Sequence, residues 1–191
     1  MKHWPEVDIL KHLQWRNDTP QTAVTGYLMR IALTGLIGFS GAPAMVSGDT
    51  HAGTPFADTW ETLLTEARAQ ARRCGGDTYA KGSPLTWNAR LGAAAQAHSE
   101  DMAHMSQLSH EGSEGEVLAD RLGATGYEAS AWAENVAAGQ QDATTVVAAW
   151  LDSPGHCANI MFADYTEFGA GIDRNTSGTP YWTLVLAAPL D

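Results

Sequence analysis

The chain has 191 residues, of which 44% are hydrophobic, and it carries a formal net charge of −11. This length fits one compact domain with an additional segment, and the apolar content is too low for a membrane protein with several spans. The strong negative charge argues against binding to nucleic acid or to anionic membrane surfaces, because both would repel the protein.

The first 44 residues have the layout of an N-terminal extension with a secretory signal. Arg30 precedes a nine-residue apolar run, Ile31–Phe39, and the small residues Ala42–Ala44 follow it. A basic flank, a short apolar core and a small-residue cleavage site are typical of export signals, whereas a membrane span needs about 20 apolar residues. The alternative is an ordinary buried apolar segment. On the export reading Met29 is a candidate start, and the mature chain begins near Met45.

Three helices are predicted before the first strand. Thr54 is a suitable N-cap for the first helix, Pro55 suits its first turn, and the apolar positions that follow share one face. The second helix has apolar positions at spacings of three and four. The predicted ranges are Thr54–Cys74, closed by two glycines, then Asn88–Gln107 and the short Glu116–Leu122.

The second half of the chain is predicted to be rich in strands. One more helix follows the first strand, with Asp142 as its N-cap and Pro154 as its end, and a short helical turn comes next. The ranges are Trp132–Ala138 (strand), Ala143–Asp152 (helix), 156–162 (turn), Phe168–Arg174 and Tyr181–Ala187 (strands). Helices come first and strands pair late, which predicts an α+β fold with a small antiparallel sheet.

The two cysteines, Cys74 and Cys157, predict a disulfide bond. An even pair of cysteines in an exported protein is usually bonded, and no CxxC pattern points to a metal site. The chain-entropy model assigns on the order of 4 kcal/mol to a loop of this size. The alternative is two unrelated buried thiols.

Three residues are candidates for the chemistry of a cleft. His110 and His156 are expected beside glycines at loops or helix edges, and Glu134 is a carboxylate inside an apolar strand. A buried carboxylate needs a partner, which a histidine supplies, and two neutral imidazoles with a carboxylate can form an open zinc site. The alternative is three separate structural hydrogen bonds. His98 lies on the apolar stripe of the second helix and is interpreted as a core histidine with one hydrogen bond.

Several stretches, taken together, resemble the CAP superfamily of cysteine-rich secretory proteins, antigen 5 and pathogenesis-related proteins, and specifically its compact bacterial branch. The resemblance runs in order from about Asp58 to Pro189. It is carried by "LTWNARLGAAAQAHSEDM" at Leu85–Met102, "SH" at Ser109-His110, "EN" at Glu134-Asn135 and "WLDSPGHCANIM" at Trp150–Met161. The domain division is then 1–44 as extension and signal, 45–57 as linker and start of the first helix, and 58–191 as the CAP domain.

The resemblance implies a three-layer α-β-α sandwich and a cleft with two histidines and two acidic residues that binds divalent metal in some members. His110, Glu134 and His156 match three of these positions, and the metal ligands implied are His110 and His156, with zinc as a candidate. Ser153 stands where the fourth, acidic residue is expected, and Ala133 stands where the family signature has glycine. The implied binding cleft comprises His110, Glu134, His156, Ser153 and Asn135.

The functional expectation is a secreted or periplasmic, non-enzymatic module that binds a ligand or partner at this cleft. By resemblance, the ligand is a lipid or sterol, or the partner is an extracellular protein. One alternative is a protease-like hydrolase, in which a His–Glu pair activates Ser153, Ser109 or a water. Another is a structural component of the cell envelope. No nucleic acid and no transmembrane segment in the mature chain are expected.

Overall fold

The computed structural model describes residues 54–190. The predicted signal, its cleavage near Met45 and the alternative start at Met29 lie outside the described residues. None of the helices between residues 54 and 190 combines the length and the apolar character needed to cross a bilayer.

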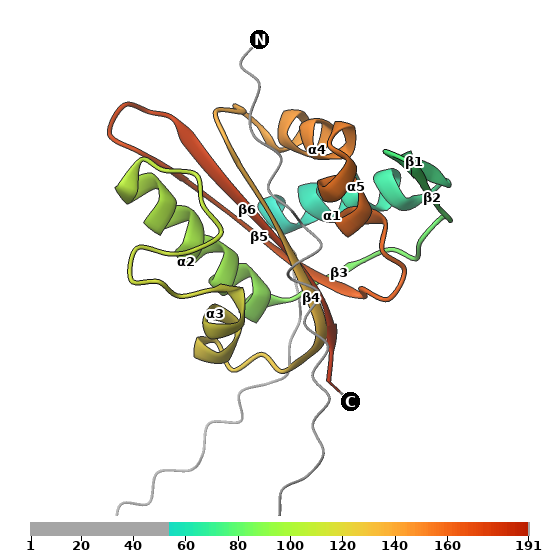
Figure 1. Cartoon of the computed structure of the whole chain (residues 1–191), viewed down its shortest axis with the longest axis horizontal. Helices are drawn as coiled ribbons and strands as arrows, with labels where there is room; N and C mark the ends of the chain where they lie inside the picture. The colour runs from blue at the N-terminus through green and yellow to red at the C-terminus, as the bar shows by residue number, and fades with distance from the viewer. Residues whose placement is uncertain (1–53, 191) are drawn as a thin grey trace, which may run out of the picture. The chain divides into compact units, whose positions relative to one another are not determined.

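Five helices and six strands make up the described part of the chain (Figure 1). In order they are α1 (Pro55–Arg68), β1 (Arg72–Cys74), β2 (Asp77–Tyr79), β3 (Thr86–Trp87), α2 (Ala89–Met105), α3 (Leu118–Ala124), β4 (Ala129–Ala138), α4 (Ala143–Asp152), α5 (Pro154–Met161), β5 (Glu167–Arg174) and β6 (Pro180–Pro189).

The main sheet has four strands in the order β3-β5-β6-β4. Strands β5, β6 and β4 are antiparallel, and Glu134 on β4 lies opposite Val185 on β6. The two-residue strand β3, which the sequence analysis missed, adds a short parallel edge to β5. The prediction of a small antiparallel sheet is confirmed for the three long strands.

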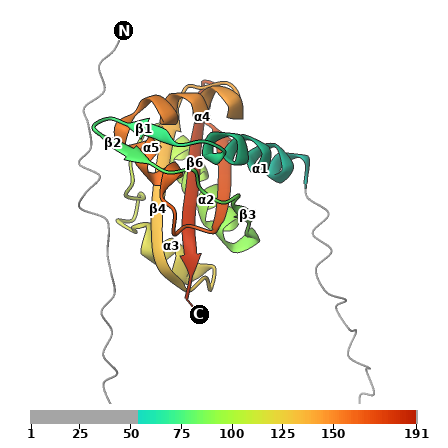
Figure 2. The ribbon, with the colours of Figure 1, turned by 90° about the vertical axis from the view of Figure 1, so that its right-hand side faces the viewer.

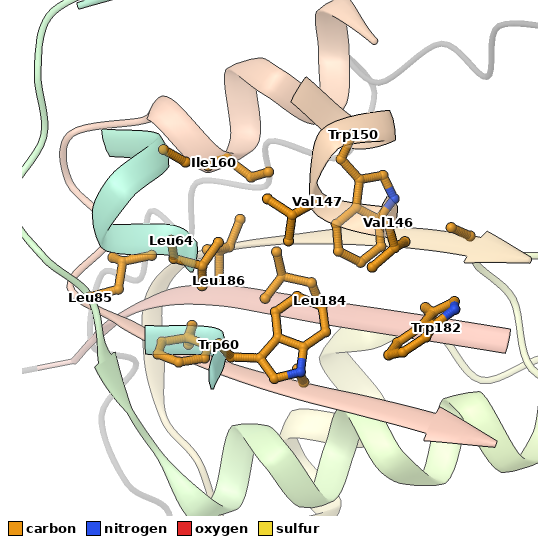
Figure 3. Packing of buried hydrophobic residues seen from close by; sticks show 14 of the residues in the cluster. Trp60, Leu64, Leu85, Val146, Val147, Trp150, Ile160, Trp182, Leu184 and Leu186 are labelled. Carbon is orange, nitrogen blue, oxygen red and sulfur yellow. The ribbon is translucent and has the colours of Figure 1, made fainter. Parts of the chain in front are cut away.

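Helices cover both faces of this sheet, which confirms the three-layer α-β-α sandwich. In Figures 1 and 2, α2 and α3 lie on one face, and α1, α4 and α5 lie on the other. Figure 3 shows the core of the second layer, where Trp60 of α1 and Trp150 of α4 pack over Leu184 of β6. The ring centroids of these two tryptophans are 6.0 Å apart.

On the opposite face, α2 approaches β5 closely because β5 carries two glycines. A Cβ atom on Gly169 would lie 2.1 Å from the backbone nitrogen of Gly92 in α2, and one on Gly171 would lie 2.5 Å from the Cα of Gln96. Any side chain at these two positions would therefore push the helix off the sheet. Asn88 starts α2 as predicted, since its side-chain oxygen accepts hydrogen bonds from the first turn.

The first helix is shorter than predicted. Thr54 caps it, but it ends at Arg68, and Cys74 lies in strand β1 and not in a last helical turn. The two glycines that were taken as a helix stop form the tight turn between β1 and β2, where Gly75 has a φ of +61°. A Gly-Gly pair suits a two-residue hairpin turn as well as a helix end, so the sequence pattern could not separate the two.

Arg68 fixes the point where α1 ends. Its guanidinium is fully buried and donates hydrogen bonds to four backbone carbonyls, those of Ser83, Ile160, Phe162 and Tyr165. Two of these carbonyls belong to the end of α5, where an arginine also complements the helix dipole. Arg68 thereby ties the ends of α1 and α5 together.

The predicted disulfide bond between Cys74 and Cys157 is confirmed. Both cysteines are buried and pack against Met161. The bond joins the β1–β2 hairpin to α5, the helix that carries His156. It spans 83 residues, so it constrains a large part of the unfolded chain.

Candidate functional site

Glu134 is the centre of the candidate site. It lies in the middle of β4 with its carboxylate on the sheet face covered by α2 and α3, and only 5% of its side chain is exposed. Trp132 and Val136, two residues away on either side, pack into the apolar clusters of the same face. A carboxylate in such surroundings is costly unless partners compensate for the lost water.

Two side chains supply those partners. His110 donates a hydrogen bond from Nδ1 to Glu134 Oε1 at 2.8 Å, and Arg121 donates from Nη2 to Oε2 at 2.7 Å. Burial alone would raise the pKa of Glu134, but the hydrogen bond from His110 and the charge of Arg121 outweigh burial and lower it. Glu134 is therefore an anion with both oxygens engaged.

Arg121 was not identified from the sequence. It comes from α3, and it also donates to the carbonyls of Glu116 and His110, at 3.1 and 3.3 Å. A signal was available, because Arg121 shares the buried stripe of α3 with Leu118 and Leu122 at helical spacing. A basic side chain on an apolar face needs a buried acceptor, and Glu134 is the acid that meets this need.

His98 is buried, and its Nε2 donates to the Ser109 carbonyl at 2.9 Å. Its Nε2 also lies 3.7 Å from Glu134 Oε1. The sequence analysis placed His98 in the core and apart from the cleft, but this histidine lies next to the candidate site. Burial lowers the pKa of His98 and outweighs the opposing charge of Glu134. His98 is thus a neutral ring that holds the backbone next to His110.

The loop that carries His110 is fastened at several points. Asp101 in α2 accepts hydrogen bonds from both the backbone nitrogen and the hydroxyl of Ser113, at 2.7 and 2.6 Å. Together with the bonds from His98 and Arg121, these contacts fix the loop on both sides of His110. Because Nδ1 of His110 is directed at Glu134, its Nε2 remains available, and 30% of the side chain is exposed.

His156 belongs to the other helical layer. It lies in α5, which is attached to β4 by Asn135: the Asn135 amide donates to the His156 carbonyl at 3.1 Å and accepts from Asn159 at 2.9 Å. Burial, and next the nearby charge of His110, lower the pKa of His156 to about 4. His156 is therefore a neutral imidazole near His110. It lies on α5, the helix that Asn135 attaches to β4.

The remaining predicted cleft residues have different surroundings. Asn135 is fully buried with its amide engaged by α5, so its contacts hold the helix in place. Ser153 precedes α5 as its N-cap residue, without a side-chain cap hydrogen bond, and is half-buried. Ser109 accepts a hydrogen bond from the Glu111 nitrogen. Within residues 54–190, neither serine hydroxyl is hydrogen-bonded to a histidine.

The residues present do not fit the zinc site that the sequence analysis expected. In the described part of the chain, no three His, Cys, Asp or Glu side chains are arranged to hold a metal ion. The reason is Arg121, which occupies Glu134 Oε2 while His110 occupies Oε1, so that His110 and His156 remain as the only two candidate donors of the expected set. Zinc sites in proteins generally use at least three protein ligands.

Comparisons with known proteins agree with this architecture. Residues 62–186 match the family model described as CAP, the cysteine-rich secretory protein family. A protein of Bacillus subtilis described as the uncharacterized membrane protein YlbC is 34% identical over 90 residues, which are 47% of this chain and 26% of YlbC.

Two solved structures illustrate the range of similarity. An extracellular protein containing an SCP domain from Bacillus anthracis is 26% identical, with a TM-score of 0.50 over 56% of this chain and 34% of that protein. An outer surface protein from Borrelia burgdorferi has a TM-score of 0.55 over 70% of this chain and 92% of that one, at 16% identity, which shows a shared fold. This chain spans about a quarter of YlbC and a third of the Bacillus anthracis protein. Because the family model covers well over half of the sequence, the chain belongs to the cysteine-rich secretory protein (CAP) family.

Proposed function

We propose that this protein is an exported binding module whose ligand contacts His110 and His156 beside strand β4. One histidine comes from each helical layer. Burial, and next the charge of His110, lower the pKa of His156 to about 4. Both side chains are partly accessible, whereas Glu134, which accepts from His110, and its neighbours Arg121 and His98 are buried. A ligand could therefore contact the imidazole rings of His110 and His156, while the buried residues around Glu134 hold the His110 loop in place.

The observation that carries this proposal is the pairing of Glu134. Both of its oxygens are engaged, and its pKa is lowered, so it is a poor proton acceptor for a reaction at neutral pH. Neither Ser109 nor Ser153 has a histidine partner within the described residues, and a serine nucleophile needs an adjacent general base, which the expected His–Glu pair would have supplied. These features support binding over hydrolysis.

Export is supported by independent observations. The chain has a buried disulfide bond, which persists in oxidising compartments. The apolar run before Ala42–Ala44 has the pattern of a secretory signal. The Bacillus anthracis relative is described as extracellular, and the Borrelia burgdorferi protein with the same fold as an outer surface protein.

Binding and hydrolysis can be separated with one set of probes. The full chain is incubated with a tryptic digest of casein and, separately, with a cholesterol–cyclodextrin complex, while the ring signals of His110 and His156 are followed by NMR. New amino groups are counted in the casein sample. Binding predicts saturable shifts of both ring signals without new amines. His104, an exposed histidine on α2, is the internal control and should not shift.

Each other outcome contradicts the proposal in a different way. New amines that disappear in the double variant His110→Ala/His156→Ala would establish a hydrolase. No shift of either ring with either probe would leave a structural envelope component as the better description. Cell fractionation tests export: an intact Met1 terminus in a cytoplasmic fraction would contradict it, and a terminus near Met45 outside the cytoplasm would support it.

A further inference from the structure

Strand β4 forms one edge of the main sheet (Figure 2). It pairs with β6 and with no other strand of the described residues. In an antiparallel strand, the N–H and C=O of a given residue point to the same side, and the next residue points to the other side. Every second residue of β4 therefore directs its backbone groups away from the sheet.

Hydrogen bonds on both sides identify which residues these are. Gly139, just after β4, donates to the Pro180 carbonyl, so the odd-numbered residues face β6. Trp150 donates from its indole nitrogen to the Val136 carbonyl at 3.2 Å, so the even-numbered residues face outward. The register agrees with this assignment. Ala187 of β6 lies opposite Trp132, and its carbonyl accepts a hydrogen bond from the Thr166 nitrogen on the side of β6 away from β4.

Two features bound the outward edge of β4, and the outward backbone groups between them have no partner within residues 54–190. Trp150 covers it at Val136, and a bulge interrupts the ladder between Ala129 and Ala131. Between these points lie Trp132 and Glu134, whose outward N–H and C=O groups make no hydrogen bond within residues 54–190. Natural proteins usually protect such groups, since an open edge is a template for another strand.

The side chains along the first part of this unpaired stretch are partly exposed, and two of them are small. Trp132 is partly exposed, and the residues on either side of it, Ala131 and Ala133, are small and partly exposed. Small side chains allow another backbone to come within strand-pairing distance, about 4.8 Å. The stretch ends at Glu134, whose carboxylate accepts from His110 at 2.8 Å, so a segment paired with it would come near His110.

The charge around the open edge indicates which kind of segment fits. Glu111 and Glu114 lie exposed on the loop that carries His110, and Asp120 lies exposed on α3 next to Arg121. Arg121 itself is buried against Glu134 and does not neutralise them at the surface. A basic segment would be attracted to this edge and an acidic one repelled.

We infer that the outward edge of β4 at Trp132 and Glu134 binds an extended, basic peptide segment of an extracellular protein by strand addition. Backbone hydrogen bonds supply the pairing, and the exposed carboxylates select for positive charge. This inference rests on the proposed function, since it names the class of ligand that reaches the site of His110 and His156.

The test uses the full chain and a blocked peptide of alternating lysine and valine, eight residues long. Saturable binding should slow hydrogen exchange of the Trp132 and Glu134 amides. The Ala133 amide, which already faces β6, serves as the control within the same strand and should not change. The same peptide with all backbone nitrogens methylated should bind at least about tenfold more weakly, because it cannot donate to the strand.

Charge is tested on the protein. Glu111→Lys/Glu114→Lys should weaken the peptide roughly fivefold, because it removes the attraction beside the edge. Glu66→Lys/Asp77→Lys makes the same change in net charge on α1 and β2 and should have little effect. In the described residues, Glu111 and Glu114 make hydrogen bonds through their backbone nitrogens and not through their side chains, and the four exchanged side chains are exposed.

Several results would overturn the inference. They are no saturable binding of the lysine–valine peptide, equal binding of the methylated peptide, or protection at the β3 edge in place of Trp132 and Glu134. If the casein digest or the sterol still shifts the signals of His110 and His156 in that case, the proposed function stands and only the strand addition is wrong. If neither probe binds, both fail.

Discussion

The two helical layers hold their cleft histidines by different means. On the side of α2 and α3, a polar network of Glu134, Arg121, His98 and Asp101 fixes the loop around His110. On the other side, α1, α4 and α5 share a tryptophan-rich core (Figure 3). Arg68 and the disulfide bond fasten α5, the helix that carries His156.

This difference separates two kinds of sensitivity. Apolar packing loses stability when volume is removed, whereas a buried charge network loses stability when one partner is removed. The α5 side should therefore respond most to changes in core volume, and the His110 side to changes in charge and pH. The predictions below test this contrast, from the largest expected effect to the smallest.

The largest effect is expected from Trp150→Ala. It leaves a cavity between α1 and α4 and removes the hydrogen bond to the Val136 carbonyl. Urea unfolding should show a loss of about 3–5 kcal/mol. Trp87→Ala is the matched control, because Trp87 is only partly buried, at the rim of the same cluster, and it should cost clearly less. Equal losses would contradict the central role given to the α1–α4 contact.

Arg121→Met should come next, at about 3 kcal/mol, because it leaves Glu134 charged and buried with only His110 as a close partner. The double variant Arg121→Met/Glu134→Gln should recover much of this loss, since it removes the uncompensated charge as well. Urea midpoints of the two single variants and the double variant measure the coupling. Simple additivity of the two losses would show that the pair does not act as a unit.

Removing the disulfide bond with Cys74→Ser/Cys157→Ser should cost about 2–4 kcal/mol, because the unfolded chain gains freedom over an 83-residue loop. NMR should show the ring signal of His156 changing more than that of His110, because the bond attaches to α5, which carries His156, and not to the loop that carries His110. Larger changes at His110 would contradict the separation of the two layers. Mass mapping of the non-reduced protein should find the linked peptides.

Acidification should destabilise the protein between about pH 6.5 and pH 4. The pKa of His156 is lowered to about 4 in the folded state, so the unfolded chain binds more protons in this window and stability falls as pH falls. The loss from this one group is on the order of 3 kcal/mol. The variant His156→Asn should show a flatter profile of urea midpoint against pH, and an unchanged profile would contradict the assignment to His156.

Glu134 acts at lower pH and in the same direction. Its pKa is lowered in the folded state, so its contribution is present above the unfolded value of about 4.3 and is lost as pH falls below it. The pH range in which Glu134 loses its contribution to stability therefore lies directly below the range for His156. The profile of Glu134→Gln should therefore differ from that of the natural protein mainly below about pH 4.5.

Much of the secondary structure followed from local signals. Helix α4 spans Ala143–Asp152 with Asp142 as its cap, as predicted, because the cap and the following Pro154 act over a few residues. The predicted end of α1 was wrong, because Gly75 and Gly76 form the turn of a hairpin, which becomes apparent only from the pairing of β1 with β2. The same limit explains why the two-residue strand β3 was missed.

The sequence alone determined the family motifs, the order of helices and long strands, and the pairing of Cys74 with Cys157. It also indicated that Glu134 needed a partner, since a carboxylate inside an apolar strand must be compensated. It named a histidine as that partner, and His110 contacts Glu134 Oε1, but only the tertiary structure revealed the second partner. Arg121 lies on a separate short helix, and its contact with Glu134 depends on how α3 packs against β4, a distance that no local spacing encodes. That contact, and not the histidines alone, leaves Glu134 without a free oxygen for a metal ion.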